Sequence, residues 1–484
     1  MKRHLHKIIA CFCGTVLFAS TVFSTTYSNK TFLAPRPVGV NAAMEYTTWH
    51  NLIGHSPESQ GGFNVELTGF YQESTNKTEI GKYFGVDGKN NFVLDAAGTN
   101  VNYRYLIHKS DPINPDTSTA NVKFEPKQTT YGARLDYYQD LHKLIKGLYF
   151  KLNTSFVELR NDLQMNIFDT AGELAGDDLK NYFAGTYQVF DATTDNLQAK
   201  LTSAKIDGKK SVSGFADVDL TLGYKIIDTE KYYFALNLGL TIPTGNKVKG
   251  QYIFEPIRGN GRHYAFGGGV ESQIKLWEKE NQSIKLIYTI DYRYLLKEQE
   301  KRTPSFNRTF TNQSNLSHYY LLGKASDEVN QSLIPAANIL TTDIDVRPGG
   351  QLDSIVQFAY TNKGFTFDLG YNVFYKQEES VSLRTDPFAT DVYGVADINY
   401  YTDDAFGENL FWAVDEHALS ILDLDLDSVK TPAQLTHKVY GGFGYVWHKA
   451  TYSGMAGIGG SYEFATDNNA LEVWGAWLKI GFGF

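Results

Sequence analysis

The chain has 484 residues, with 54 acidic and 45 basic side chains and a formal net charge of −9 at neutral pH. This acidic balance argues against a nucleic-acid-binding protein. Aromatic residues make up 14% of the chain, mostly Tyr and Phe, and there are 43 glycines but only four methionines, a mixture that favours strands over helices.

The first 24 residues have the pattern of a secretory signal peptide. The first seven residues include the basic residues Lys2, Arg3 and Lys7. An apolar stretch, 8–23, follows, and the small residue Ser24 comes directly after it. A short apolar stretch followed by small polar residues is typical of a signal that is cleaved after export. The alternative is an N-terminal membrane anchor, which the shortness of the stretch disfavours.

Both cysteines of the chain, Cys11 and Cys13, lie in this segment. The mature chain therefore has no disulfide or thiolate chemistry. That composition suits a protein that crosses an oxidising compartment unfolded. Removal of residues 1–24 takes away three basic and no acidic side chains, so the net charge moves from −9 to −12.

Residues 25–61 precede the first strand-like segment. They contain the proline-rich stretch Leu33-Ala-Pro-Arg-Pro37 and a segment with loosely helical spacing, Asn41–Ile53.

Twelve later segments alternate between apolar and polar positions over about ten or more residues, which is typical of strands with two unlike faces. The clearest is 213–227, where Val218, Leu220 and Leu222 alternate with Asp219 and Thr221. The twelve segments are 62–73, 129–140, 148–161, 213–227, 232–243, 263–277, 283–295, 351–361, 364–380, 434–448, 452–466 and 470–484.

The connections between these segments alternate between long and short. The long links are 74–128, 162–212, 244–262, 296–350 and 381–433; the short links are 141–147, 228–231, 278–282, 361–363 and 449–451. The last link, 466–469, is short where a long one is due. Outer-membrane β-barrels have short periplasmic turns and long outer loops, whereas a soluble β-sandwich has no reason to alternate in this way. We therefore predict an all-β fold, a single antiparallel transmembrane barrel over 62–484 with about twelve strands (10–14), in the outer membrane of a Gram-negative-type bacterium.

The C-terminal strand resembles the signal that the barrel-assembly machinery reads. Apolar residues alternate with small or polar ones up to a terminal phenylalanine, and the signal residues are Leu478, Ile480, Phe482 and Phe484. The alternative is the edge strand of a soluble protein. The expected partners are thus membrane lipid, the assembly machinery and small solutes, with no nucleic acid; the oligomeric state stays open.

The inward face of the predicted barrel carries charges of both signs in equal number. Charges are placed inward because each would cost a few kcal/mol on the lipid face. The lumen-lining candidates are Arg134, Asp136, Lys151, Asp217, Asp219, Lys225, Glu271, Lys275, Lys285, Asp291, Arg293, Asp353, Asp368, Lys376, Lys438 and Lys479, with Glu66 and Glu472 as further acidic positions. Two interpretations stay open: the charges pair and fill a narrow barrel, or they ring a water-filled channel. Residues 25–61 are accordingly either a periplasmic tail or a plug that enters the barrel.

One hairpin carries a family resemblance. The strand Gly214-Phe-Ala-Asp217 to Gly223-Tyr224, followed by a strand that ends in Pro243-Thr-Gly245, resembles outer-membrane transporters associated with phenol-degradation (MetA-pathway) gene clusters. The match covers 213–277. It implies a channel for hydrophobic or aromatic compounds, although Pro243 and Gly245 would also end a strand in any protein.

Signals for enzymes and metal sites are weak. His55-Ser56 precedes the barrel, and His263, His437 and His448 fall near strand ends without a nucleophile motif. The alternation of Asp423, Asp425 and Asp427 fails the EF-hand pattern, because Ser428 and Gln434 stand where Gly and Glu are needed. We expect no catalytic residues, no metal and no cofactor. The sequence favours a passive outer-membrane channel for small solutes; the alternative is a filled barrel that displays its loops for adhesion.

Overall fold

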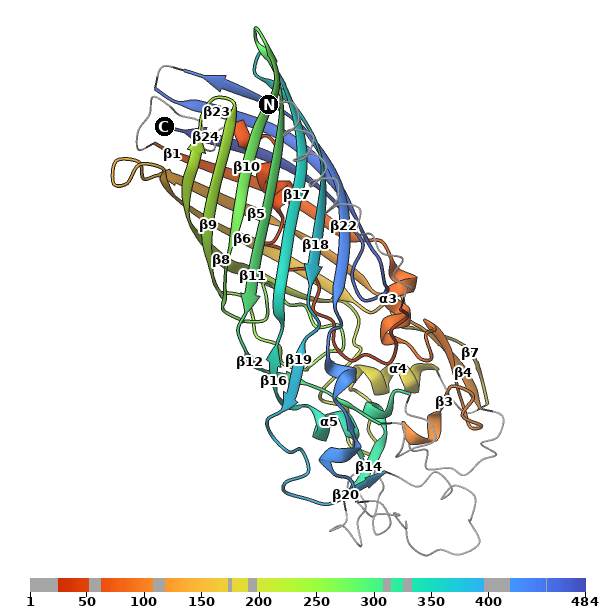
Figure 1. Ribbon diagram of the computed structural model, residues 1–484. Helices are drawn as coiled ribbons and strands as arrows, with labels where there is room; N and C mark the ends of the chain where they lie inside the picture. The colour runs from red at the N-terminus through yellow and green to blue at the C-terminus, as the bar shows by residue number, and fades with distance from the viewer. Residues whose placement is uncertain are drawn as a thin grey trace, which may run out of the picture.

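A computed structural model describes residues 25–51, 62–107, 118–172, 176–189, 198–307, 315–324, 333–395, 418–449 and 451–484. The predicted signal peptide and His55-Ser56 lie outside these ranges. Twelve antiparallel strands close into one barrel in the order β1-β24-β23-β22-β18-β17-β11-β10-β9-β8-β6-β5 (Figure 1). The predicted fold class and the predicted strand number are therefore confirmed.

The barrel strands fall within a few residues of the twelve predicted segments. Their bounds are β1 Phe63–Ser74, β5 Lys127–Asp140, β6 Leu148–Asp162, β8 Lys210–Asp228, β9 Tyr232–Ile242, β10 Ala265–Lys279, β11 Gln282–Leu295, β17 Gly349–Asn362, β18 Phe365–Lys376, β22 Gln434–His448, β23 Ser453–Ala465 and β24 Val473–Gly483. The first and last strands pair along their whole length, from Asn64 opposite Gly483 to Ser74 opposite Val473, so the barrel has no open edge.

The alternation of side chains gives the barrel two unlike faces. Large apolar side chains point outward and are exposed in the isolated chain, among them Leu238 (71% exposed), Leu369 (62%) and Leu478 (64%). Apolar exposure on this scale fits a wall that faces lipid. The inward positions next to them are mostly polar, and many of these side chains are charged and buried.

The long loops fold into a structured body, here called the head: the described residues of 75–126, 163–209, 243–264, 296–348, 377–433 and 466–472 (Figure 1). An apolar core of its own includes Phe92, Tyr182, Phe183, Tyr319 and Tyr320. Its strands are β2 Asn91–Asp95, β3 Val101–Asn102, β4 Thr119–Lys123, β7 Asn166–Ala171, β12 Glu298–Arg302, β13 Ser305–Phe306, β14 Leu321–Lys324, β15 Ile334–Pro335, β16 Thr342–Arg347, β19 Ser380–Leu383, β20 Tyr393–Val395 and β21 Leu424–Asp425. Its helices are α3 Lys77–Phe84, α4 Gly176–Ala184, α5 Ala336–Leu340 and the 3-10 turns η2 Tyr103–Tyr105, η4 Ser317–Tyr319, η7 Ile421–Asp423 and η8 Leu426–Val429.

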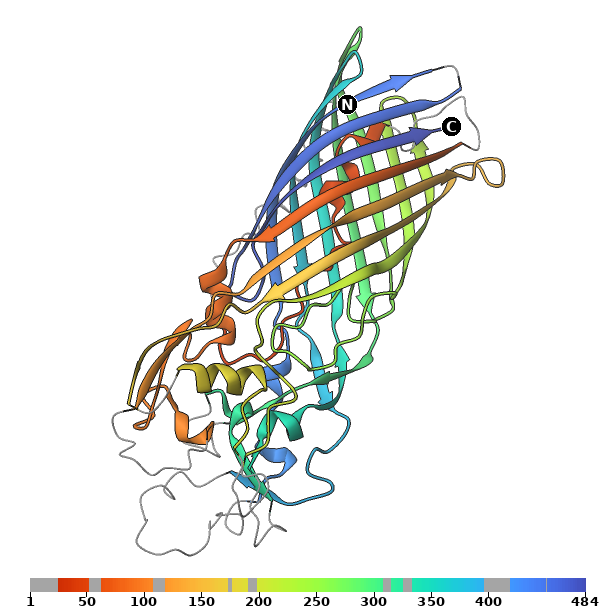
Figure 2. The same ribbon diagram turned by 180° about the vertical axis from the view of Figure 1, so that it is seen from behind.

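Residues 25–51, here called the N-terminal segment, begin in the head and continue inside the barrel, not beside it (Figure 2). The segment starts at the head, where the backbone N–H of Tyr27 donates to Asn468 Oδ1 at 2.8 Å. It ends near the short turns with α2, Ala42–Tyr46, and the turn η1, Trp49–Asn51. The expected helix Asn41–Ile53 is thus broken at Thr47 and Thr48, and Thr48 has a φ of +66°. Within the described residues, no helix is long and apolar enough to cross a membrane.

Candidate pore and the segment that fills it

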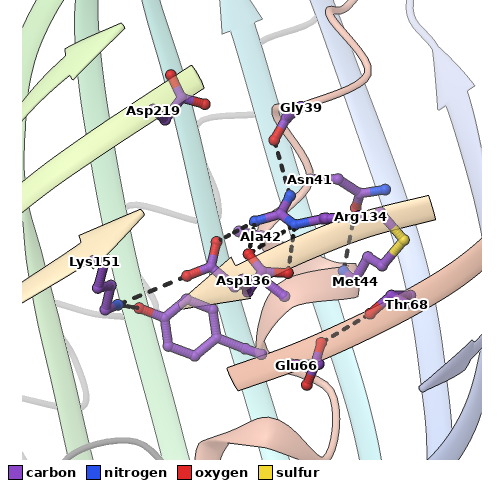
Figure 3. A network of polar contacts seen from close by, with 12 residues as sticks. Gly39, Asn41, Ala42, Met44, Glu66, Thr68, Arg134, Asp136, Lys151 and Asp219 are labelled. Carbon is purple, nitrogen blue, oxygen red and sulfur yellow. Dashed lines mark hydrogen bonds and ion pairs between the residues drawn. The ribbon is translucent and has the colours of Figure 1, made fainter. Parts of the chain in front are cut away.

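A charged cluster holds the middle of the N-terminal segment to β5 and β6 (Figure 3). Arg134 of β5 donates to Asp136 at 2.7 Å and to Glu45 of the segment at 2.8 Å, and it also donates to the carbonyl oxygen of Gly39 at 2.9 Å. Lys151 of β6 donates to the Tyr46 hydroxyl at 3.1 Å. The guanidinium fork binds Asp136 of the same strand, which orients Arg134, and its remaining N–H groups hold the segment at Glu45 and Gly39.

A second cluster centres on Arg36 of the segment. Its guanidinium donates to both carboxylate oxygens of Asp353 at 3.0 Å, to Asn372 at 2.8 Å and to Glu463 at 3.2 Å. Lys438 on the neighbouring strand forms an ion pair with Glu463 at 3.0 Å. Every group is buried, so each charge needs its partner: removal of one member of a buried pair costs about 3–5 kcal/mol.

Lys479 of the last strand caps the short helix α2. Its ammonium group donates to the carbonyl oxygens of Met44 at 2.6 Å, Glu45 at 3.0 Å and Thr47 at 2.8 Å, and it pairs with Glu66 of β1 at 2.8 Å. A cation at the free carbonyls of a helix C-terminus is stabilising. The predicted assembly strand therefore also binds the segment with its inward face.

Asp368 of β18 holds the periplasmic end of the segment. One carboxylate oxygen accepts the backbone N–H of Thr48 at 2.8 Å, and the other lies 2.9 Å from Nε2 of His50. Gln357 also donates to Asp368 at 3.0 Å. These contacts explain why the helix ends here, because the N–H of Thr48 bonds to the wall and not to the helix.

Three inward glycines of β22 and β23 make room for this end of the segment. A Cβ atom on Gly442 would overlap the methyl group of Thr47, and a Cβ atom on Gly444 or Gly457 would lie 2.8 Å from the hydroxyl of Thr48. The glycine-rich character of these strands, which was visible in the sequence, is thus the space that the segment occupies.

A cavity of about 120 Å³ remains between the segment and the wall. Its ionisable lining residues are Glu45, Lys151, Asp219, Glu271, Asp291, Arg293 and Asp353. A polar cavity of this size holds several waters. The space left in the lumen can therefore hold water between the segment and the wall.

At the outer end, a buried ion cluster joins the segment to the head. Arg302 of β12 donates to Glu300 and Glu379 at 2.7 and 2.6 Å, and its guanidinium lies 3.7 Å from the ring centre of Phe32. Burial would raise the pKa of Glu379, but the Arg302 and Lys376 cations outweigh it and lower that pKa to about 2. We call this group the latch. The Glu379 carboxylate therefore stays ionised at neutral pH.

The structure sorts the predicted lumen residues into three groups. Those that contact the segment or a group bound to it are Arg134, Asp136, Lys151, Glu271, Asp353, Asp368, Lys376, Lys438 and Lys479. Those near the cavity or the outer rim are Asp217, Asp219, Asp291 and Arg293. Those toward the short turns are Lys225, Lys275 and Lys285. Lys225 pairs with Asp140 and Lys275 pairs with Glu278, while Lys285 lies opposite Lys275 on the neighbouring strand.

One predicted position is wrong and several functional groups were missed. Glu472 precedes β24 and does not face the lumen; it accepts the backbone N–H of Ala465 at the outer end. Glu463 of β23 is the acidic residue that faces the lumen here, where it pairs with Lys438. Strict alternation along β23 would have predicted it. Arg36, Glu45 and His50 had no strand pattern to place them.

The histidines and the aspartate considered as weak candidates for catalytic or metal sites make local structural contacts. His263 lies 2.9 Å from Glu300, and His437 lies 2.7 Å from the Tyr371 hydroxyl. His448 lies 2.8 Å from the hydroxyl of Ser453. Asp425 caps the turn η8 by accepting the N–H of Asp427. In the part of the chain that the structure describes, no group of three or more His, Cys, Asp or Glu side chains could hold a metal ion.

No family model matches the chain, and no curated protein matches it. Among solved structures, it is similar to an outer-membrane channel from Pseudomonas putida F1, with 11% identity, a TM-score of 0.38 and coverage of 89% of this chain and 100% of that one. It is also similar to the CymD monoaromatic hydrocarbon channel (8%, TM-score 0.28, coverage 93% and 94%) and to a Pseudomonas aeruginosa FadL homologue (8%, TM-score 0.30, coverage 94% and 99%). At these TM-scores, we draw no conclusion about the solute from these proteins.

The closed barrel, its apolar outer belt and its alternating loops define the class by themselves. The chain is an outer-membrane β-barrel protein, with its short turns toward the periplasm and its head outside the cell. The lumen of this barrel contains a segment of its own chain (Figure 2).

Proposed function

We propose that the protein is a gated outer-membrane channel for small polar solutes, closed by its N-terminal segment. The proposal rests on the position of the N-terminal segment in the lumen. Its first residues pack in the head, where Leu33 is part of the apolar core, and the rest runs along the lumen to the short turns without joining the strands of the wall (Figure 2). Its removal would leave a lumen lined by charged and amide side chains and, toward the short turns, by tyrosines and other apolar residues, and water would fill the polar part.

The contacts of the segment support a removable plug. Ion pairs and hydrogen bonds, such as Arg36 with Asp353 and Arg134 with Glu45, hold it along the lumen, and water can replace these partners when the segment leaves. Near the short turns, Met44 and Trp49 also pack in an apolar cluster with wall residues such as Tyr440 and Met455, so departure of the segment has to expose this apolar surface as well. The polar lining also favours polar solutes over the hydrophobic or aromatic ones that the family resemblance implies.

A second candidate function is surface interaction, because the head has its own apolar core and exposes apolar side chains. Leu422 is 82% exposed and Val392 is 51% exposed. A display protein would need its barrel only as an anchor, and its lumen would never open.

A cysteine pair separates these two functions. A Cβ atom on Gly442 would lie 3.6 Å from the Cβ of Thr47, which suits a disulfide, and residues 25–484 contain no cysteine. The double variant Thr47→Cys/Gly442→Cys should be silent in a planar bilayer when oxidised and should show discrete openings when reduced. Silence in both states would contradict the channel and favour display. Equal conductance in both states would show that the solute path does not depend on the segment.

A further inference from the structure

The barrel wall binds the main chain of the N-terminal segment as well as its side chains. Within the described part of the chain, nine hydrogen bonds join wall or loop side chains to the backbone of residues 34–48. At the outer end, the carbonyl oxygen of Ala34 accepts from Lys376 and from Gln434, both at 3.2 Å, and its N–H donates to Thr431 at 3.1 Å.

The same recognition continues toward the periplasm. Arg134 binds the carbonyl oxygen of Gly39, and Asp353 accepts the N–H of Ala42 at 3.3 Å. Lysine and arginine side chains thus lie at carbonyl oxygens, and carboxylates lie at N–H groups. The residues bound at these positions include Ala34, Gly39 and Ala42, whose side chains are too small to specify the contact.

We infer that the lumen is a binding site for peptide main chains and that short peptides are the solutes of the open channel. This inference rests on the proposed function, because the site becomes available only when the segment leaves. The segment then acts as a built-in competitor that occupies the site of the solute.

The chemistry of the wall favours peptides over other small polar solutes. A peptide backbone presents alternating C=O acceptors and N–H donors, and the wall supplies cations for the first and carboxylates for the second. A sugar has hydroxyl groups that could meet some of these partners, so a disaccharide is the appropriate competing probe. N-methylation removes the backbone donors of a peptide and leaves its carbonyl oxygens.

The test uses the full mature chain with one substitution, Thr47→Cys. Thr47 is fully buried beneath the wall, so reaction of the new thiol with a maleimide reports departure of the segment. Millimolar tetra-alanine should raise the modification rate several-fold. N-methylated tetra-alanine and maltose at the same concentration should leave it unchanged.

Thr342→Cys in β16 is the matched control, because Thr342 is a buried threonine of the head. Its modification rate should not respond to tetra-alanine. An unchanged rate in the Thr47→Cys variant, or an equal rise with all three probes, would overturn the inference. If the reduced Thr47→Cys/Gly442→Cys variant still shows openings in the bilayer, failure of the maleimide test overturns only the recognition of peptides. The gated channel is then still supported.

Discussion

At the scale of the residue, buried charges and inward glycines decide where the N-terminal segment sits. Arg36 and Glu45 of the segment each meet oppositely charged wall residues, and glycines leave space where the segment bends at Thr47 and Thr48. The charges set the position along the lumen, and the glycines set how closely the segment approaches the wall.

Gly444→Val should displace the periplasmic end of the segment. The added side chain would overlap Thr48, and overpacking of this kind costs about 1–3 kcal/mol. We expect more frequent openings in a planar bilayer and, when the change is combined with Thr47→Cys, faster maleimide modification of the new thiol. Gly69→Val is the control, because a Cβ atom on Gly69 meets nothing within 4 Å. Equal behaviour of the two variants would contradict the role of Gly444.

His318 should make the stability of the head depend on pH. Burial lowers its pKa to about 3. The folded head therefore favours the neutral ring, and its stabilisation is full above the unfolded pKa of about 6.5 and is lost as the pH falls from there toward 3. At pH 5 the loss should be about 2 kcal/mol.

Limited proteolysis of the head at pH 7.5 and pH 5 measures this effect. Cleavage should accelerate at pH 5 in the native chain. The variant His318→Phe, which keeps a ring but cannot titrate, should lose the difference between the two pH values. A native chain with the same cleavage rate at both values would show that His318 does not control the head.

At the scale of the element, alternation along strands could be read from the sequence, and contacts between distant segments could not. Period-two alternation located all twelve barrel strands, because one face meets lipid and the other does not. Residues 25–51 have no such pattern. Their position depends on pairs such as Arg36 with Asp353, which are 317 residues apart in the chain.

The family-like hairpin has a local structural role. Gly245 donates its N–H to Asp217, and the Thr244 hydroxyl donates to the carbonyl oxygen of Ala216, so the two halves of the motif close one turn at the outer rim. The pairing of β6 with β8 shifts register beside it, and Gly214 has a φ of +138°. The motif thus shapes the rim, and it does not by itself specify a solute.

Arg302→Met should weaken the latch between β12 and the segment. It removes the guanidinium between Glu300 and Glu379, while Glu379 keeps Lys376 at 3.5 Å and Glu300 keeps His263 at 2.9 Å. Loss of one hydrogen-bonding partner from a buried polar group costs about 1–3 kcal/mol. We expect faster proteolysis near Phe32 and at the loop after β18. The control Arg347→Met changes an exposed arginine at the end of β16 and should have little effect. Unchanged proteolysis in Arg302→Met would contradict the latch.

At the scale of the whole molecule, the path of the segment determines on which side of the membrane residue 25 lies. Thr25 donates its backbone N–H to Asp467 in the outer loop between β23 and β24. The chain therefore runs from the cell surface through the lumen to the periplasmic end and only then enters β1. The sequence predicted a periplasmic segment or a plug, and it gave no direction for its course.

An epitope tag placed directly before Thr25 should be labelled by antibody on intact cells. A tag in the short turn between β5 and β6, at 141–147, should be labelled only after the outer membrane is permeabilised, because that turn faces the periplasm. Labelling of both tags only in permeabilised cells would show that the segment does not reach the surface.

The most direct test of the account compares the single-channel conductance of the mature chain with that of a chain that lacks residues 25–51. We predict that the channel of the mature chain is mostly closed. The deletion variant should form a stable, water-filled pore with discrete conductance steps. Heat-modifiable migration on a gel would confirm that both barrels are folded. A folded deletion variant without conductance would contradict the gated channel and leave a filled barrel that presents its head.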